Sequence, residues 1–222
     1  MRNMIFHTMN LSQPWIQDVL NHEIVSHHTI SFIVLDEDPL YAQDKITLKD
    51  KDNFKRYLDS LKQYGINEDD IHIYHLEEMP LPEFRDVVEK SDVLVMIRNP
   101  ELAMCFIDDM HRDILREFDG LVIGAGYGGL ALLEGYSDEE GYHEGFGCIP
   151  DINLIYDFVQ NKEHLSRAMK LLEMSGGDVV ALPLESGIVI DESYFEVLGN
   201  GFILSAKDMD DLYEALETME KW

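Results

Sequence analysis

Short apolar runs alternate with amphipathic segments along the chain, a pattern typical of an α/β protein. The run TISFIVL at residues 29–35 is apolar and β-branched almost throughout, as expected of a strand buried on both faces of a parallel sheet. Runs of similar character predict further strands at residues 4–6, 71–76, 92–97, 120–123, 179–182, 187–190 and 194–197. Because amphipathic segments separate many of these runs, the sequence predicts a doubly wound, mostly parallel sheet, in which functional sites lie at the carboxyl ends of strands.

Helices are expected where apolar residues recur every three to four positions. The predicted helices span residues 15–20, 52–64, 82–90, 100–116, 129–134, 165–174 and 207–219. Ser12 is expected to cap the first helix, Gly65 to stop the second and Pro100 to open the fourth. The stretch SDEEGYHE at residues 137–144 is expected to be an acidic loop. No segment resembles an interdomain linker, so we expect residues 1–222 to form a single α/β domain.

Acidic side chains dominate the charge, since 44 Asp and Glu against 17 Lys and Arg give a formal net charge of −27. Nucleic acid is therefore not expected as a partner, because binding it requires Lys and Arg to neutralise phosphates. No apolar run approaches the roughly 18 residues of a membrane span, and the N-terminus carries no signal-peptide pattern. We expect no membrane partner and a cytoplasmic location. Cys105 and Cys148 lie in apolar settings and form no CxxC pair, so neither a disulfide framework nor a metal site is predicted.

A glycine-rich turn, VIGAGYGG at residues 122–129, follows a predicted strand and precedes a predicted helix. Gly124, Gly126 and Gly128 have the G-x-G-x-G spacing of a nucleophile elbow, in which small residues flank a reactive side chain on a sharp turn. A plain glycine-rich turn would show the same spacing. A dinucleotide site would require G-x-G-x-x-G in the opening βαβ unit, whereas this turn comes late in the chain, so no cofactor is predicted.

The segments around this turn carry a resemblance to a known family. SDVLVMIRNPELAMCFI at residues 91–107, followed by DGLVIGAGYGGLALLEG at residues 119–135, resembles the serine peptidases that include dipeptidase E (aspartyl dipeptidase) and cyanophycinase. GFGCIP at residues 145–150 and GIVIDESYFEVLGNGFIL at residues 187–204 are similar to later parts of that family. The resemblance implies the flavodoxin-like fold of class I glutamine amidotransferases, with a late β-hairpin region.

Three positions depart from the family's catalytic pattern. The resemblance places the nucleophilic serine at Gly126, which has no side chain to form an acyl-enzyme. It places the family's glycine loop at Ile97, Arg98 and Asn99, where only the asparagine is kept, and the family's histidine at Ile155 of INLIYD. Losing either nucleophile or base costs on the order of 10⁶ in turnover in a well-studied serine protease. The resemblance therefore implies a pseudoenzyme, a peptidase homologue without the catalytic serine and histidine. We expect such a protein to bind or regulate rather than to catalyse.

Several residues are candidates for a remaining function. Arg98 could hold the carboxylate of a small acidic ligand or acidic peptide, or could pair with a neighbouring acidic side chain. Asn99 is a further ligand-binding candidate beside it. The alternative to a binding protein is an active hydrolase that uses Tyr127 as nucleophile and His143 as base, although a phenol with a pKa near 10 needs strong activation.

Other features leave alternatives open. Cys148 is either a buried structural thiol or a reactive one. The acidic stretch at residues 137–144 is either a solvated loop or a cation site, although it lacks calcium-loop spacing. A protein partner or a homodimer is possible, with the apolar ridge at residues 130–133 or the C-terminal helix as the self-contact.

Overall fold

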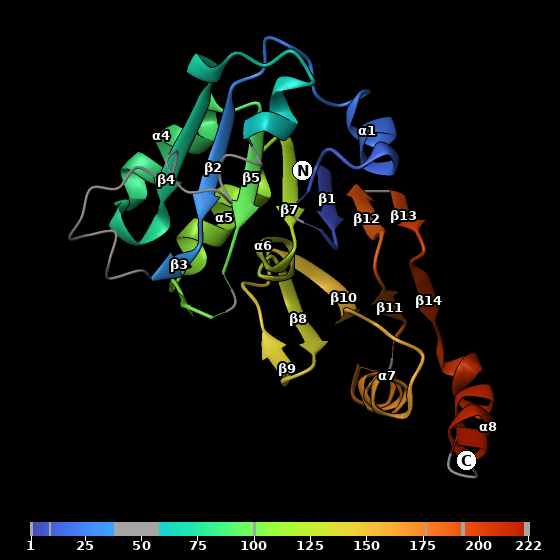
Figure 1. Ribbon diagram of the computed structural model, residues 1–222. Helices are drawn as coiled ribbons and strands as arrows, with labels where there is room; N and C mark the ends of the chain where they lie inside the picture. Colours follow the sequence, from blue (N-terminus) through green and yellow to red (C-terminus); the bar gives the residue numbers. More distant parts are fainter. Residues whose placement is uncertain are drawn as a thin grey trace.

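A computed structural model describes residues 2–8, 10–37, 58–99, 101–175, 177–191 and 194–219. Its larger sheet has seven strands in the order β13-β12-β1-β7-β5-β2-β4 (Figure 1). Five neighbouring strands are parallel, and the late hairpin of β12 and β13 joins them antiparallel at the β1 side. The bounds are β1 Arg2–Phe6, β2 Ile30–Val34, β4 Ile71–His75, β5 Val93–Ile97, β7 Leu121–Ala125, β12 Ser186–Asp191 and β13 Tyr194–Gly199. The predicted α/β class, its mostly parallel sheet and its late hairpin are confirmed.

A second sheet, which sequence analysis did not predict, has five strands in the order β14-β11-β10-β8-β9. Strands β8, β10 and β11 are parallel, whereas β9 and β14 pair antiparallel at the two edges. The bounds are β8 Leu133–Asp138, β9 Gly141–Glu144, β10 Ile149–Tyr156, β11 Val179–Leu182 and β14 Phe202–Leu204. A short antiparallel pair of β3 Asp36–Glu37 and β6 Ala103–Met104 lies apart from both sheets.

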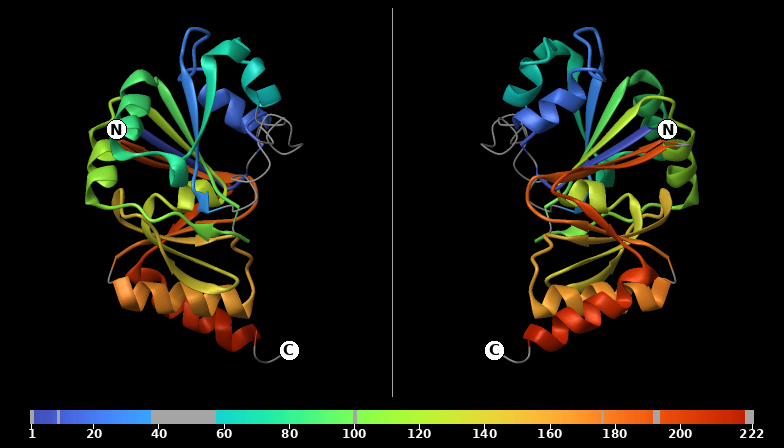
Figure 2. Two further views of the ribbon diagram at one scale, coloured as in Figure 1. Left: turned by 90° about the vertical axis from the view of Figure 1, so that its left-hand side faces the viewer. Right: turned by 90° about the vertical axis from the view of Figure 1, so that its right-hand side faces the viewer.

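Helices cover the sheets in layers (Figure 2). The α-helices are α1 Pro14–Leu20, α4 Leu81–Lys90, α5 Asp109–Glu117, α6 Tyr127–Leu130, α7 Lys162–Ser175 and α8 Met209–Met219. Helix α1 and the helical residues 58–62 cover one face of the seven-stranded sheet. Helices α4, α5 and α6 share the opposite face with the five-stranded sheet, whose outer face is covered by α7 and α8. Short 3₁₀ turns occur at Glu68–Asp70, Leu76–Glu78 and Ala206–Asp208.

The segment after the glycine turn differs most from prediction. The helix expected at residues 129–134 is wrong, because α6 ends at Leu130 and β8 begins at Leu133. The loop expected at residues 137–144 is also wrong, because these residues complete β8 and form β9, with the turn at residues 139–140. Periodicity alone does not show whether a short apolar run such as LALL forms a helix or a buried strand. Here the strand conformation of β8 is fixed by its pairing with β10.

Two helix starts also differ from prediction. The expected start at residue 100 is wrong, since α5 begins at Asp109, where the Asp108 side chain accepts a 3.0 Å hydrogen bond from the His111 amide. Pro100 itself lies outside the described residues. Helix α1 begins after Gln13 rather than after a Ser12 cap, with Pro14 in its first turn. Residues 52–57 of the second predicted helix also lie outside the described part, and Gly65 follows its end at φ 78°.

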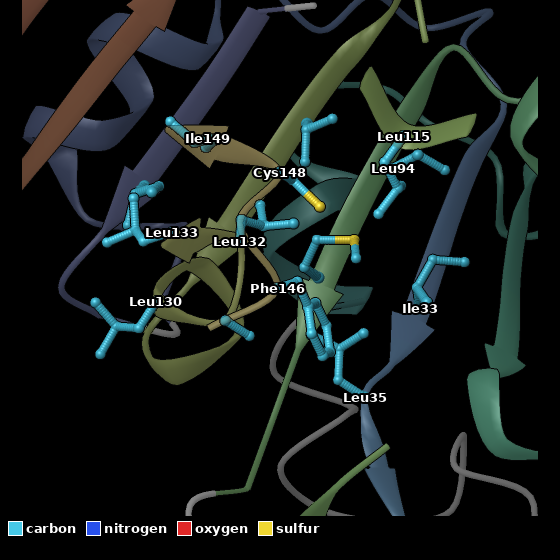
Figure 3. Close-up of a cluster of buried hydrophobic side chains, with 14 of the residues drawn as sticks. Ile33, Leu35, Leu94, Leu115, Leu130, Leu132, Leu133, Phe146, Cys148 and Ile149 are labelled. Carbon is cyan, nitrogen blue, oxygen red and sulfur yellow. The ribbon is translucent and has the colours of Figure 1, made fainter. Parts of the chain in front are cut away.

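The apolar ridge at residues 130–133 is core rather than surface. Leu130, Ala131, Leu132 and Leu133 are at most 1% exposed, so the predicted self-contact through this ridge is wrong. Figure 3 shows three of these side chains in the cluster between the two sheets, together with Phe146 and Cys148. Within the described residues, no helix combines the length and apolar character needed to cross a membrane.

Candidate functional site around the glycine elbow

The carboxyl ends of strands from both sheets meet around the glycine turn. Strands β1, β5 and β7 of the larger sheet end at Phe6, Ile97 and Ala125, and β10 of the smaller sheet ends at Tyr156. The side chains of Tyr127 and Tyr156 touch, with ring centroids 4.9 Å apart, so these ends belong to one site. Open α/β sheets place ligands at this edge.

The backbone of Gly126 turns sharply at the end of β7. Its φ is 56° and its ψ is −132°, a conformation that non-glycine residues adopt only at a cost of roughly 1 to 3 kcal/mol. Its amide donates a 2.9 Å hydrogen bond to the Phe6 carbonyl, and α6 begins at the next residue. This strand–turn–helix arrangement is the backbone arrangement of a nucleophile elbow, here without a side chain.

The other glycines of the turn are required by close packing. A Cβ on Gly124 would lie 2.1 Å from the Gly129 Cα, and one on Gly128 would lie 2.1 Å from the Met96 carbonyl oxygen. A Cβ on Gly129 would lie 2.6 Å from the Ile5 side chain. Helix α6 therefore sits directly on strands β1, β5 and β7, and most of the G-x-G-x-G spacing has a structural cause that is independent of chemistry.

Tyr127 follows the elbow and packs among aromatic side chains. Its ring lies 4.9 Å from Tyr156 and 6.3 Å from Tyr136, measured between centroids. Burial raises the pKa of the Tyr127 phenol well above 10, and the nearby Asp138 carboxylate raises it further. A phenol in this setting is protonated at neutral pH and is a poor nucleophile.

Arg98 and Asn99 follow the end of β5. The Arg98 Nη1 donates a 2.8 Å hydrogen bond to the Tyr136 hydroxyl, and within the described residues its buried Nε makes no hydrogen bond. No ion pair of Arg98 is found in the described part of the chain, so the acidic partner considered as an alternative is not seen there. The Asn99 amide donates to a carboxylate oxygen of Asp36 at 2.8 Å, and its side chain lies at the surface.

His143 lies on β9 rather than in a loop. Its Nε2 lies 2.7 Å from the Asp138 carboxylate, and its ring stacks on Tyr136 with centroids 5.0 Å apart. Asp138 is 7% exposed and also accepts a 2.9 Å hydrogen bond from the Glu140 amide. The structure thus brings His143, Tyr136 and Arg98 into one contact chain that reaches Tyr127.

Ile155 and Cys148 lie away from this chain of contacts. Ile155 is fully buried on the outer face of the five-stranded sheet, among side chains of α7, so its neighbour Tyr156 is the β10 residue that faces the elbow. Cys148 is 3% exposed in the core between the sheets, and burial raises its pKa to about 11. Its surroundings are those of a structural thiol rather than a reactive one.

A further histidine–carboxylate pair, not predicted from the sequence, lies at the same edge. His7 follows β1, Asp157 follows β10, and the His7 Nε2 lies 3.2 Å from an Asp157 carboxylate oxygen. The His7 ring stacks on Tyr156 with centroids 4.6 Å apart and an interplanar angle of 16°. The available signal was that His7 comes directly after a predicted strand, at the edge where sites are expected.

A separate cleft of about 650 Å³ lies at the opposite edge, where the strands begin. Its lining includes Arg2, Arg85, Asp92 and Gly120. It therefore holds none of the predicted site residues. In the described part of the chain, no group of three or more His, Cys, Asp or Glu side chains could hold a metal ion.

The fold is shared with solved peptidases. A peptidase from an acI-B1 Actinobacterium is similar with a TM-score of 0.58 and 14% identity, over 92% of this chain and 94% of that one. A putative peptidase E protein from Listeria monocytogenes EGD-e gives a TM-score of 0.50 and 10% identity, over 88% and 96% of the two chains. No family model matches the sequence, and no curated protein matches it significantly. At these identities the likeness establishes the fold, with peptidase E-like structures among its neighbours.

Proposed function

We propose that this chain is a non-catalytic relative of peptidase E-like peptidases that binds a small acidic ligand or an acidic peptide at the carboxyl edge of its larger sheet. The observation that carries the proposal is Gly126, which has the backbone of a nucleophile elbow but no attacking atom. Removing the nucleophile alone costs a well-studied serine protease on the order of 10⁶ in turnover. A protein that keeps the turn without the side chain is therefore suited to binding.

Arg98 supports an acidic ligand. It is a cation at the carboxyl edge of the sheet, in a chain with a formal net charge of −27. Its Nη1 is held by the Tyr136 hydroxyl, whereas its Nε makes no hydrogen bond within the described residues. A guanidinium held at one end can present its remaining N–H groups to a carboxylate in a fixed geometry.

The ligand proposal is tested by calorimetric titration with L-aspartate. We expect Arg98→Gln to weaken binding at least about tenfold, because a hydrogen bond to a charged group contributes roughly 1.5 to 3 kcal/mol. Arg85→Gln is the matched control, since Arg85 lines the cleft at the opposite edge, and it should bind like the unaltered protein. Equal binding by Arg98→Gln and the unaltered protein, or no binding by either, contradicts an acidic ligand at Arg98.

Absence of catalysis is tested separately. We expect the purified protein to leave N-terminal aspartyl dipeptides intact and to take no label from a fluorophosphonate, because position 126 has no hydroxyl to react. A family serine peptidase serves as the positive control for both reagents. Stoichiometric labelling or dipeptide turnover would refute the proposal.

A second candidate function is hydrolysis by Tyr127 with His143. It is favoured by the contacts that link the two residues through Tyr136, and opposed by the raised pKa of the Tyr127 phenol. Under this alternative, Tyr127→Phe abolishes any measured turnover, while Tyr142→Phe, a change at a half-exposed tyrosine next to His143 on β9, does not. Turnover that survives Tyr127→Phe would remove this candidate.

A further inference from the structure

The pairing of β1 with β7 places His7 beside the elbow. The two strands are parallel, with Ile5 opposite Gly124 and Phe6 opposite Ala125. The next residues on the two strands are His7 and Gly126, and the Gly126 amide continues the ladder with its 2.9 Å bond to the Phe6 carbonyl. Neighbouring strands lie about 4.8 Å apart. The backbone of His7 is thus the immediate lateral neighbour of the elbow residue.

The His7 side chain lies on the same face of the sheet as the elbow helix. Side chains alternate along a strand, Phe6 packs on the outer face, and Ile5 packs in the core between the sheets, against Leu130 of α6. His7 therefore shares the side of Ile5, which its stacking on Tyr156 supports. Its ring is 8% exposed, so it is a buried imidazole rather than a solvated surface group.

Asp157 and Tyr156 fix the orientation of this imidazole. The Asp157 carboxylate contacts Nε2 at 3.2 Å, and no hydrogen bond to the other ring nitrogen, Nδ1, is found in the described part of the chain. Asp157 is held at φ 56°, a left-handed conformation that Asp adopts more readily than most residues. The Tyr156 hydroxyl donates a 2.6 Å hydrogen bond to the His7 carbonyl. A base held by a third group beside a nucleophile position is the arrangement of nucleophilic catalysis.

We infer that His7, oriented by Asp157, is placed to act as a general base for a side chain at position 126. The elbow therefore has a proton acceptor at the end of β1, whereas Gly126 has no side-chain proton to give up. Asp157 acts as a positioning residue. The site would act on acyl compounds such as esters once position 126 carried a hydroxyl or thiol. The inference is independent of ligand binding at Arg98, because it concerns different residues and a different measurement.

The test is to place a thiol at the elbow with Gly126→Cys and to measure its alkylation by iodoacetamide across pH. The thiol proton passes to the His7 ring, the thiolate sulfur bonds to the reagent's CH₂ carbon, and iodide leaves. We expect the pKa of the introduced thiol to lie at least about one unit below the ordinary value near 8.5. The unaltered protein gives the background from Cys105 and Cys148, both of which are buried.

The decisive comparison adds His7→Gln to the Gly126→Cys variant. We expect the thiol pKa to rise by at least about one unit, with an alkylation rate at pH 7 roughly tenfold lower. Adding Asp157→Asn should raise the thiol pKa by less. Adding His111→Gln, which removes a carboxylate-paired histidine on α5 that belongs to neither candidate function, should leave the pH profile unchanged. Identical pH profiles with and without His7 would overturn the inference.

A second measurement covers the case in which Gly126→Cys does not fold, since a side chain at this φ costs roughly 1 to 3 kcal/mol. In the unaltered protein, NMR titration should show the Gly126 amide resonance shifting with the same midpoint as the His7 ring protons. His7→Gln should abolish that shift. A Gly126 amide that does not respond to the His7 titration would overturn the inference without any variant at the elbow.

Discussion

The two histidine–carboxylate pairs near the elbow are built differently. His143 and Asp138 are five residues apart on one hairpin, and the Asp138 side chain is 7% exposed. His7 and Asp157 are 150 residues apart, come from different sheets, and the Asp157 side chain is 47% exposed. The first pair closes a local hairpin around a buried charge, whereas the second depends on the packing of the two sheets and keeps its carboxylate accessible. Similar pairs can thus serve stability in one place and chemistry in another.

The largest loss of stability is expected from breaking the pair of His143 and Asp138. Asp138→Asn should lower the free energy of unfolding by about 2 kcal/mol, because it weakens the hydrogen bonds made by the buried Asp138 carboxylate. Asp138 contacts His143 and the Glu140 amide, and its backbone carbonyl accepts a hydrogen bond from Arg167. Asp157→Asn, the matched change in the other pair, should cost less than about 1 kcal/mol, because ion pairs exposed to solvent contribute little. Urea unfolding measures both, and equal losses would contradict the distinction between the pairs.

A smaller loss of stability is expected from a change at Tyr156, whose hydroxyl donates a hydrogen bond to the His7 carbonyl. Tyr156→Phe should cost about 1 kcal/mol at pH 8, the contribution of one hydrogen bond. Burial raises the Tyr156 pKa, so the folded phenol stays protonated while the unfolded one ionises above about pH 10. The free energy of unfolding should therefore fall as pH rises above 10, by at most about 1.4 kcal/mol per pH unit for this phenol. Tyr156→Phe should remove that part of the slope.

Tyr64→Phe is the control for this measurement. Tyr64 also donates its hydroxyl to a backbone carbonyl, that of Leu11 at 3.1 Å, and burial raises its pKa to about 12. It lies on the outer face of the larger sheet, away from both pairs. Both variants should flatten the alkaline slope, but only Tyr156→Phe should alter the His7-dependent alkylation of Gly126→Cys. An equal effect of Tyr64→Phe on alkylation would mean that the change acts through stability alone.

Much of the fold could be predicted because its parallel strands are continuous apolar runs. The seven strands of the larger sheet all fall on predicted runs. Strands β2, β5 and β7 are buried at every position, and burial on both faces leaves a signal that needs no partner information. Strands β8 and β9 could not be found in the same way. Their residues, LEGYSD and GYHE, mix acidic, glycine and aromatic positions, and they are strands because β10 lies beside β8.

The candidate site was predictable only in part. The elbow could be read from glycine spacing, because close contacts with Met96 and Ile5 demand glycine at fixed positions. The role proposed for His7 depends on Asp157, which follows a strand of the other sheet, and no local pattern reports that pairing. The orientation of Ile155 likewise follows from which face of β10 is covered by α7, a matter of tertiary packing rather than of sequence register.

Gly126 has a consequence for how this protein could change over time. Some glycine codons become serine or cysteine codons through a single nucleotide substitution, and the turn around the residue is already held by its neighbours. Acquisition of a reactive group would then require no rebuilding of the scaffold, only tolerance of one strained side chain. Libraries that randomise this codon alone would reveal whether new reactivity lies one mutational step from the present sequence.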